Sequence, residues 1–112
     1  MTSFSIGRQA EAAAATYLVN EGYRIIEQNW RTKWCEIDLV TKRSNVIYFV
    51  EVKYRTNSIS GSGLEYITAR KLSQMTRAAE SWVQRHSWSG DYELAAIAVS
   101  GKGFAVTDLV TI

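Results

Sequence analysis

The hydrophobic and polar positions of this 112-residue chain follow two different periods. Apolar residues recur every three or four positions over residues 6–21, and again from residue 66 or 68 to residue 86, which is the spacing of one face of an α-helix. Runs rich in β-branched and aromatic residues predict strands. The expected strands are 23–27, 36–40, 46–53, 92–100 and 104–112. We therefore predict an α/β fold of order α-β-β-β-α-β-β, a central mixed sheet flanked by helices.

Turn-forming residues separate these elements. Gly22 suits the position that ends the first helix, a polar turn at 42–45 joins the second and third strands, and the glycines within 101–103 indicate a hairpin. Residues 28–34 are expected to form a polar connector. Residues 56–63 are rich in glycine and serine, so we expect either a loop that orders on substrate binding or a plain connector.

Two neighbouring strands carry carboxylates inside apolar runs. Glu36 and Asp38 interrupt the strand 36–40, and Glu51 interrupts the strand 46–53. Ionised groups in an apolar strand are costly unless they are paired or bind a metal. If the strands pair, Asp38 and Glu51 can hold Mg²⁺ or Mn²⁺ between them, since magnesium binds one or two carboxylates and keeps several waters.

Lys53 follows Glu51 by two residues, so both side chains point to the same face of their strand. A lysine there can orient or help to deprotonate an attacking water, or offset the charge that grows on a phosphate. An Asp followed, after a gap of about a dozen residues, by Glu-x-Lys is the skeleton of the PD-(D/E)XK nucleases. The alternative is a structural Glu51–Lys53 ion pair, the commoner reason for such a motif on a strand.

Cationic side chains recur in two other segments. Arg31 and Lys33 stand among aromatic residues in segment 28–34, a mixture that suits phosphate contacts and base stacking. In the alternative reading, one tryptophan caps the core and the cations are solvated. The second helix carries a row at helical spacing that either follows a phosphate backbone or is simply solvated: Arg70, Gln74, Arg77, Ser81 and Arg85.

Composition narrows the class of protein. The chain is long enough for one domain, residues 1–112, and its hydrophobic fraction of 46% excludes disorder. A net charge of +2 does not by itself mark a nucleic-acid binder. The single cysteine, Cys35, excludes an internal disulfide, and the single histidine, His86, is expected to complement a helix C-terminus, not to ligate a metal. No apolar run could span a bilayer and no secretory signal is present, so we expect a cytoplasmic protein.

Several ordered motifs resemble the YraN-like family of small bacterial proteins. That family is placed in the restriction-endonuclease-like PD-(D/E)XK superfamily, near the archaeal Holliday-junction resolvases. The resemblance covers the chain from about Gly7 to Val83, and Cys35 departs from it, because the family usually has glycine there. The matching residues are Gly7, Glu11, Ala12, Tyr17, Leu18, Gly22, Tyr23, Asn29, Trp30, Arg31, Glu36, Ile37, Asp38, Leu39, Phe49, Val50, Glu51, Val52, Lys53, Arg55 and Lys71.

The resemblance implies that Asp38, Glu51 and Lys53 occupy the metal-binding and catalytic positions, and that Glu11 is the helix carboxylate that completes the acidic site. It implies a Mg²⁺- or Mn²⁺-dependent endonuclease acting on DNA, with branched or junction structures among its substrates, and a homodimer by analogy with resolvases. The alternative is a nucleic-acid- or partner-binding module that keeps the fold with little turnover. The candidate nucleic-acid contacts are Arg31, Lys33, Arg55, Arg70 and Lys71.

Overall fold

The computed structural model describes residues 3–56 and 67–112. The expected loop at 56–63 therefore lies, apart from Thr56, outside the described residues. The order of the elements is the predicted α-β-β-β-α-β-β, which is confirmed. They are α1 (Ser3–Asn20), β1 (Arg24–Arg31), β2 (Glu36–Arg43), β3 (Val46–Arg55), α2 (Ala69–His86), β4 (Asp91–Ser100) and β5 (Ala105–Thr111).

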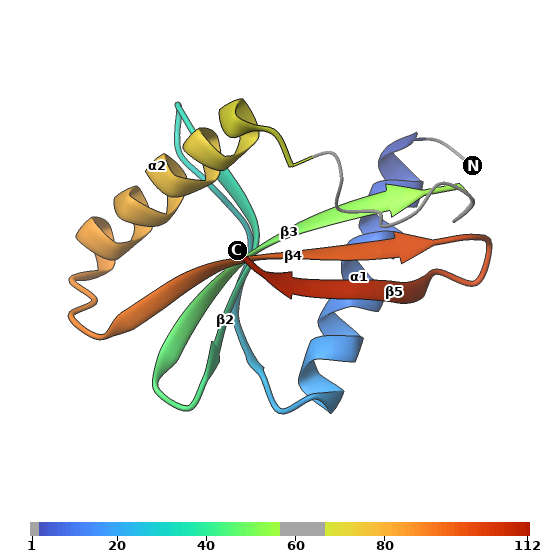
Figure 1. The fold of residues 1–112 in the computed structure, drawn as a ribbon, viewed down its shortest axis with the longest axis horizontal. Helices are drawn as coiled ribbons and strands as arrows, with labels where there is room; N and C mark the ends of the chain where they lie inside the picture. Colours follow the sequence, from blue (N-terminus) through green and yellow to red (C-terminus); the bar gives the residue numbers. More distant parts are fainter. Residues whose placement is uncertain (1–2, 57–66) are drawn as a thin grey trace.

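The five strands form one mixed sheet in which their spatial order is the same as their order in the chain. β1–β2, β2–β3 and β4–β5 are antiparallel pairs, whereas β3 and β4 are parallel. A parallel pair needs a crossover connection, and the chain between β3 and β4 supplies it through α2 (Figure 1). β3 is therefore the central strand, paired on both sides.

The two helices cover opposite faces of the sheet and create two separate cores (Figure 1). Side chains of β3 alternate between them, so Phe49 packs with the α2 residue Trp82, while Val50 packs with the α1 residue Leu18. This alternation places Glu51, the next residue of β3, on the α2 face, where it meets Lys71.

Two of the predicted connectors were wrong in their extent, because backbone pairing continues through polar side chains. β1 runs to Arg31, and Trp30 lies opposite Ile37 of β2, so only residues 32–35 turn the chain. β2 likewise runs to Arg43, and the turn to β3 consists of Ser44 and Asn45, both at positive φ (52° and 64°). Two-residue hairpins of this kind require positive φ at both positions, and asparagine tolerates it well.

α2 begins where expected. Thr68 is its N-cap, and the Thr68 hydroxyl accepts a hydrogen bond from the backbone N–H of Lys71 at 3.1 Å. The face of α2 that packs on the sheet carries the buried residues Met75, Ala78, Ala79 and Trp82. Neither α1 nor α2 is long and apolar enough to cross a membrane, and no other helix occurs in the described residues.

Candidate active site

The candidate active site lies where β2 and β3 stop pairing. Their backbone ladder runs from Arg43 opposite Val46 to Leu39 opposite Val50, and no further pair follows within the described strands. Beyond this point the Asp38 carboxylate accepts a hydrogen bond from the backbone N–H of Val52 at 2.8 Å. A side-chain oxygen thus satisfies a donor that the neighbouring strand would otherwise bind.

Asp38 is the most perturbed acid of this site. Burial, and then the negative charge of Glu51, raise the pKa of Asp38 from 3.8 to about 7, and only the Val52 N–H opposes this rise. Glu11 and Glu36 make smaller contributions to the same rise. Because Glu11 belongs to α1, acidic groups from a helix and from two strands act on one carboxylate, which favours the binding of a cation there.

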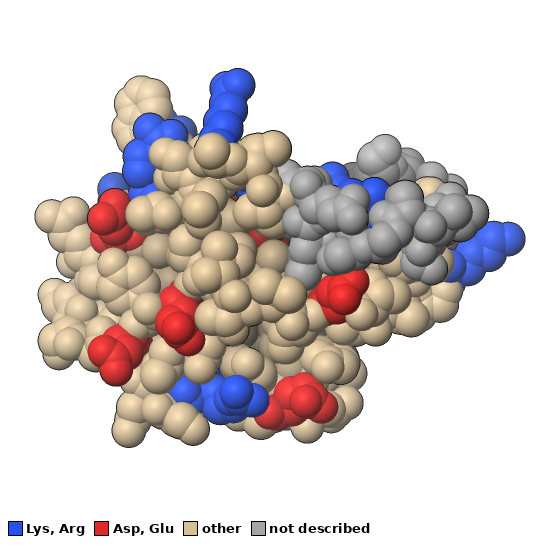
Figure 2. Space-filling model, in the orientation of Figure 1, with Lys and Arg blue, Asp and Glu red and all other residues tan. Residues whose placement is uncertain are grey.

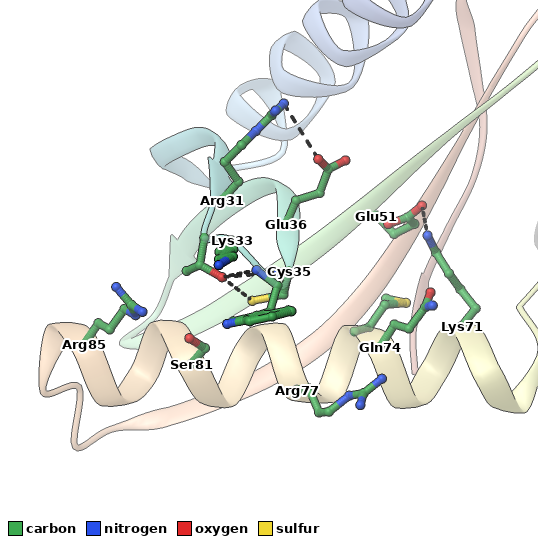
Figure 3. Close-up of a pocket in the computed structure, with 13 residues that line it drawn as sticks. Arg31, Lys33, Cys35, Glu36, Glu51, Lys71, Gln74, Arg77, Ser81 and Arg85 are labelled. Carbon is green, nitrogen blue, oxygen red and sulfur yellow. Dashed lines mark hydrogen bonds and ion pairs between the residues drawn. The ribbon is translucent and has the colours of Figure 1, made fainter.

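Glu51 is held by α2. Its carboxylate lies 2.9 Å from the Lys71 ammonium group, and the Glu51 side chain is only 18% exposed (Figure 3). The ion pair neutralises Glu51 and joins the central strand to the first turn of α2. It is also the ion pair that the structure records for Glu51.

Lys53 lies two residues beyond Glu51 on the same strand and is exposed. Glu11 is partly buried, and its negative charge contributes to the raised pKa of Asp38. In the part of the chain that the structure describes, no three acidic, histidine or cysteine side chains are arranged to hold one metal ion together. Asp38 and Glu51 remain a carboxylate pair of the kind that suits Mg²⁺, with water filling the other coordination positions.

A groove with a volume of about 720 Å³ adjoins these acids, between the β1–β2 turn and α2 (Figure 3). Five cationic and two acidic side chains line it, and Glu51 and Lys71 belong to both the groove and the acidic site. Figure 2 shows a group of Lys and Arg side chains at the upper edge of the molecule, over this turn and α2. The lining is Arg31, Thr32, Lys33, Trp34, Cys35, Glu36, Glu51, Lys71, Gln74, Met75, Arg77, Ser81 and Arg85.

The groove brings together three of the five candidate nucleic-acid contacts, namely Arg31, Lys33 and Lys71. Arg55 and Arg70 do not belong to its lining. The row at helical spacing on α2 enters the groove from Gln74 onward, and it adds two arginines that were not among the candidate contacts: Arg77 and Arg85. The helical spacing of these arginines indicated a common surface in the sequence, but rows of solvated side chains have the same spacing.

The aromatic segment between β1 and β2 divides into two roles. Trp30 packs against the α2 core, as expected if one tryptophan of this segment caps the core. Trp34, in contrast, is 84% exposed at the groove. Cys35 packs against the same core, and its Sγ lies 3.2 Å from the Thr32 hydroxyl oxygen. The position where the family resemblance leads us to expect glycine therefore accommodates a side chain.

Glu27 has a structural role that sequence reasoning did not find. Its Oε1 atom accepts a hydrogen bond from the Trp82 indole N–H at 3.0 Å and lies 3.0 Å from Nε2 of His86. His86 is the last residue of α2, stacks on Trp82 and contacts the Trp82 carbonyl through Nδ1. It therefore fastens the end of the helix to β1, in agreement with the expected helix-terminal role.

Comparison with known proteins places this arrangement in a family. The model of the uncharacterised protein family UPF0102 matches residues 10–111. A UPF0102 protein of Vibrio campbellii is 38% identical over 101 residues, which cover 88% of this chain and 83% of the relative. A UPF0102 protein of Chlorobium chlorochromatii is 41% identical over 95 residues, covering 85% and 74% of the two chains. One from Cytophaga hutchinsonii is 34% identical over 100 residues, covering 89% and 88%.

These matches confirm the resemblance to the YraN-like family that the ordered motifs carry. They extend past residue 83 and take in β4 and β5, beyond the stretch on which the resemblance rested. The chain belongs to the UPF0102 family.

Proposed function

We propose that this protein is a metal-dependent nuclease of the PD-(D/E)XK type, which hydrolyses DNA phosphodiester bonds and takes branched or junction DNA among its substrates. The observation that carries the proposal is the position of Asp38. Its carboxylate stands between two diverging strands, its pKa is raised to about 7, and Glu51 on the next strand contributes to that rise. A buried site with an excess of negative charge favours a divalent cation.

Mg²⁺ or Mn²⁺ would be held by Asp38 and Glu51, with Glu11 tuning or completing the site from α1. A bound cation of this kind supplies Lewis acidity at a phosphate and makes water a better nucleophile. The donor set fits this group, because carboxylate oxygens are the ligands that hard divalent cations prefer.

Lys53 contributes a positive charge to the same face of β3 as Glu51. Its ammonium group orients the attacking water and offsets the negative charge that grows on the phosphate. Water oxygen bonds to phosphorus, the bond from phosphorus to the leaving oxygen breaks, and the products are a phosphate monoester and a hydroxyl group. The cations of the neighbouring groove hold the phosphates on either side of the bond.

The testing experiment is cleavage of end-labelled duplex, single-stranded, flap and four-way-junction DNA in Mg²⁺, Mn²⁺ or chelator. We expect the protein to cut DNA in the presence of either metal ion but not in chelator, and to cut some of the four DNAs faster than others. Folded protein that cuts none of them under any of these conditions would contradict the proposal.

A second candidate function is a nucleic-acid- or partner-binding module with little or no turnover. The observation that favours it is the Glu51–Lys71 ion pair, since a lysine already satisfies the charge of one proposed metal ligand. Salt-dependent DNA binding without cleavage would support this candidate.

A further inference from the structure

One side chain of the groove is explained neither by the fold nor by the acidic site. Trp34 is 84% exposed at the β1–β2 turn. The other three tryptophans have structural contacts, because Trp82 donates to Glu27, Trp88 donates to the Asp91 carbonyl, and Trp30 packs against the α2 core. Among the described residues, Trp34 is therefore the one tryptophan whose ring is open to solvent, and covering the ring with a ligand would recover the free energy of its burial.

The turn that carries Trp34 is braced by hydrogen bonds. The Thr32 hydroxyl accepts from the backbone N–H of Trp34 at 3.1 Å and from that of Cys35 at 3.2 Å. The Thr32 N–H donates to the Cys35 carbonyl at 2.8 Å. Trp34 is therefore presented by a defined turn, which lowers the entropic cost of using it as a contact.

The chemistry around Trp34 identifies the class of ligand. Both acids of the groove are already paired, Glu36 with Arg31 at 3.7 Å and Glu51 with Lys71 at 2.9 Å. Within the described residues, no ion pair involves the three remaining cations of the groove: Lys33, Arg77 and Arg85. The Lys33 ammonium lies 5.2 Å from the Trp34 ring. A flat aromatic face beside unpaired cations suits a polyanion that carries flat rings.

The geometry of α2 matches a strand that runs along the groove. Gln74, Arg77, Ser81 and Arg85 follow one another along α2 and all line the groove. In Figure 3 Gln74, Ser81 and Arg85 point toward the β1–β2 turn, whereas the Arg77 side chain lies along the other edge of the helix. At 1.5 Å per residue the row from Gln74 to Arg85 covers about 16 Å. That length corresponds to about five nucleotides at the ~3.4 Å spacing of a stacked strand.

We propose that the groove binds a single-stranded segment of nucleic acid, with Trp34 stacking on an unpaired base while Lys33, Arg77 and Arg85 contact phosphates. An intact duplex stacks its bases on one another and offers none to Trp34, so the unpaired strand is the preferred ligand. The inference rests on the proposed function for the nature of the ligand, but it does not require cleavage. In a branched DNA, the same contact selects the unpaired segment beside the acidic site.

Equilibrium binding in chelator tests this without catalysis. Fluorescence anisotropy measures the affinity of the full chain for a labelled 20-nucleotide strand and for the duplex of the same sequence. We expect the strand to bind more tightly, Trp34→Ala to weaken its binding about 5- to 150-fold, and Trp34→Phe to keep most of it. Arg77→Ala and Arg85→Ala each lower the slope of log affinity against log salt by about one. Lys102→Ala, on the exposed β4–β5 turn, is the charge control and leaves binding unchanged.

The outcomes separate this inference from the nuclease. Loss of strand binding in Trp34→Ala, with thermal unfolding unchanged, supports the inference whether or not the wild type cuts DNA. Wild-type affinity in Trp34→Ala, or equal affinity for strand and duplex, overturns it even if metal-dependent cleavage is observed. Quenching of intrinsic fluorescence by the strand gives a second readout, because Trp34→Phe should bind with a reduced quenching amplitude. If the wild type binds neither DNA, the inference is overturned, and a protein partner becomes the candidate ligand of the groove.

Discussion

The carboxylate of Asp38 and the backbone N–H of Val52 form a hydrogen bond of 2.8 Å across the gap between β2 and β3. This bond holds an acid in a position that burial and Glu51 make unfavourable for its charge, so the pKa of Asp38 rises to about 7. The same point of the sheet therefore holds a hydrogen bond across the gap and a buried acid whose charge interacts with that of Glu51. A site of this kind is expected where a cation binds.

Asp38→Asn should stabilise the protein at pH 8. The pKa of Asp38 is raised in the folded state, so the stability that the protonated carboxyl provides is present below about pH 4 and is lost as the pH rises to 7. The amide keeps an acceptor for the Val52 N–H and cannot ionise. The rise in pKa corresponds to a gain on the order of 4 kcal/mol at pH 8, which vanishes near pH 4.

Urea unfolding across this pH range measures the difference. Asp91→Asn provides the matched control, because Asp91 is exposed and should respond little. A variant of Asp38 that is no more stable than the wild type at pH 8 would show that the carboxylate is not under strain there.

Divalent cations should stabilise the folded wild type at pH 8. A ligand that binds only the folded state adds about 2.7 kcal/mol at a concentration 100 times its dissociation constant. Thermal unfolding with and without Mn²⁺ should show this as a higher Tm, and Asp38→Asn and Glu51→Gln should remove most of the shift. Glu80→Gln, an exposed acid on α2, should keep it. An equal shift in all four proteins would mean that the cation binds elsewhere.

Lys71→Ala should weaken the fold and strengthen metal binding. Removing Lys71 leaves Glu51, only 18% exposed, without its partner, and frees its carboxylate for a cation. We expect a loss of about 1 kcal/mol in the free energy of unfolding without metal, and tighter Mn²⁺ binding by calorimetry.

Arg31→Ala is the comparison for Lys71→Ala. The Arg31–Glu36 pair is 71% and 61% exposed, so breaking it should change stability by less than about 0.5 kcal/mol. Weaker Mn²⁺ binding in Lys71→Ala than in the wild type would indicate that the lysine helps to build the metal site and does not compete with the cation.

Glu27→Ala should destabilise the attachment of α2 to β1. The indole N–H of Trp82, a residue only 4% exposed, would lose its acceptor, and His86 would lose its carboxylate partner. A buried donor without a partner costs about 1–3 kcal/mol. Glu27→Gln keeps an acceptor oxygen for Trp82, so chemical denaturation should show a smaller loss. Equal losses in the two variants would assign the effect to the charge and not to the indole.

Much of the fold can be predicted from the sequence, because period and turn chemistry are local properties. The order of elements, the start of α2 near Thr68 and the β4–β5 hairpin all follow from such patterns. The ends of β1 and β2 do not, because Trp30 and Lys42 continue their strands through backbone pairing with a partner strand. That pairing depends on tertiary structure, which side-chain polarity does not report.

The candidate site, like the fold, could be predicted from the sequence only where it depends on local patterns. Asp38, Glu51 and Lys53 stand out in the sequence, since they interrupt apolar strands. The ion pair of Glu51 with Lys71 and the hydrogen bond of Glu27 with Trp82 link residues 20 and 55 positions apart, so no local spacing reveals them. The exposure of Trp34 is likewise a property of the folded chain.

Single-turnover cleavage of a labelled four-way junction and flap DNA in Mn²⁺ distinguishes a nuclease from a binding module. Wild type is compared with Asp38→Asn and Lys53→Ala, and with Arg24→Ala as the charge control, because Arg24 is exposed at the end of β1 that lies away from the β1–β2 turn. We expect both site variants to fold and to lose at least about 100-fold in cleavage rate, while Arg24→Ala cuts like the wild type. Cleavage that persists unchanged in Asp38→Asn and Lys53→Ala, or that is absent in the folded wild type, would contradict this expectation.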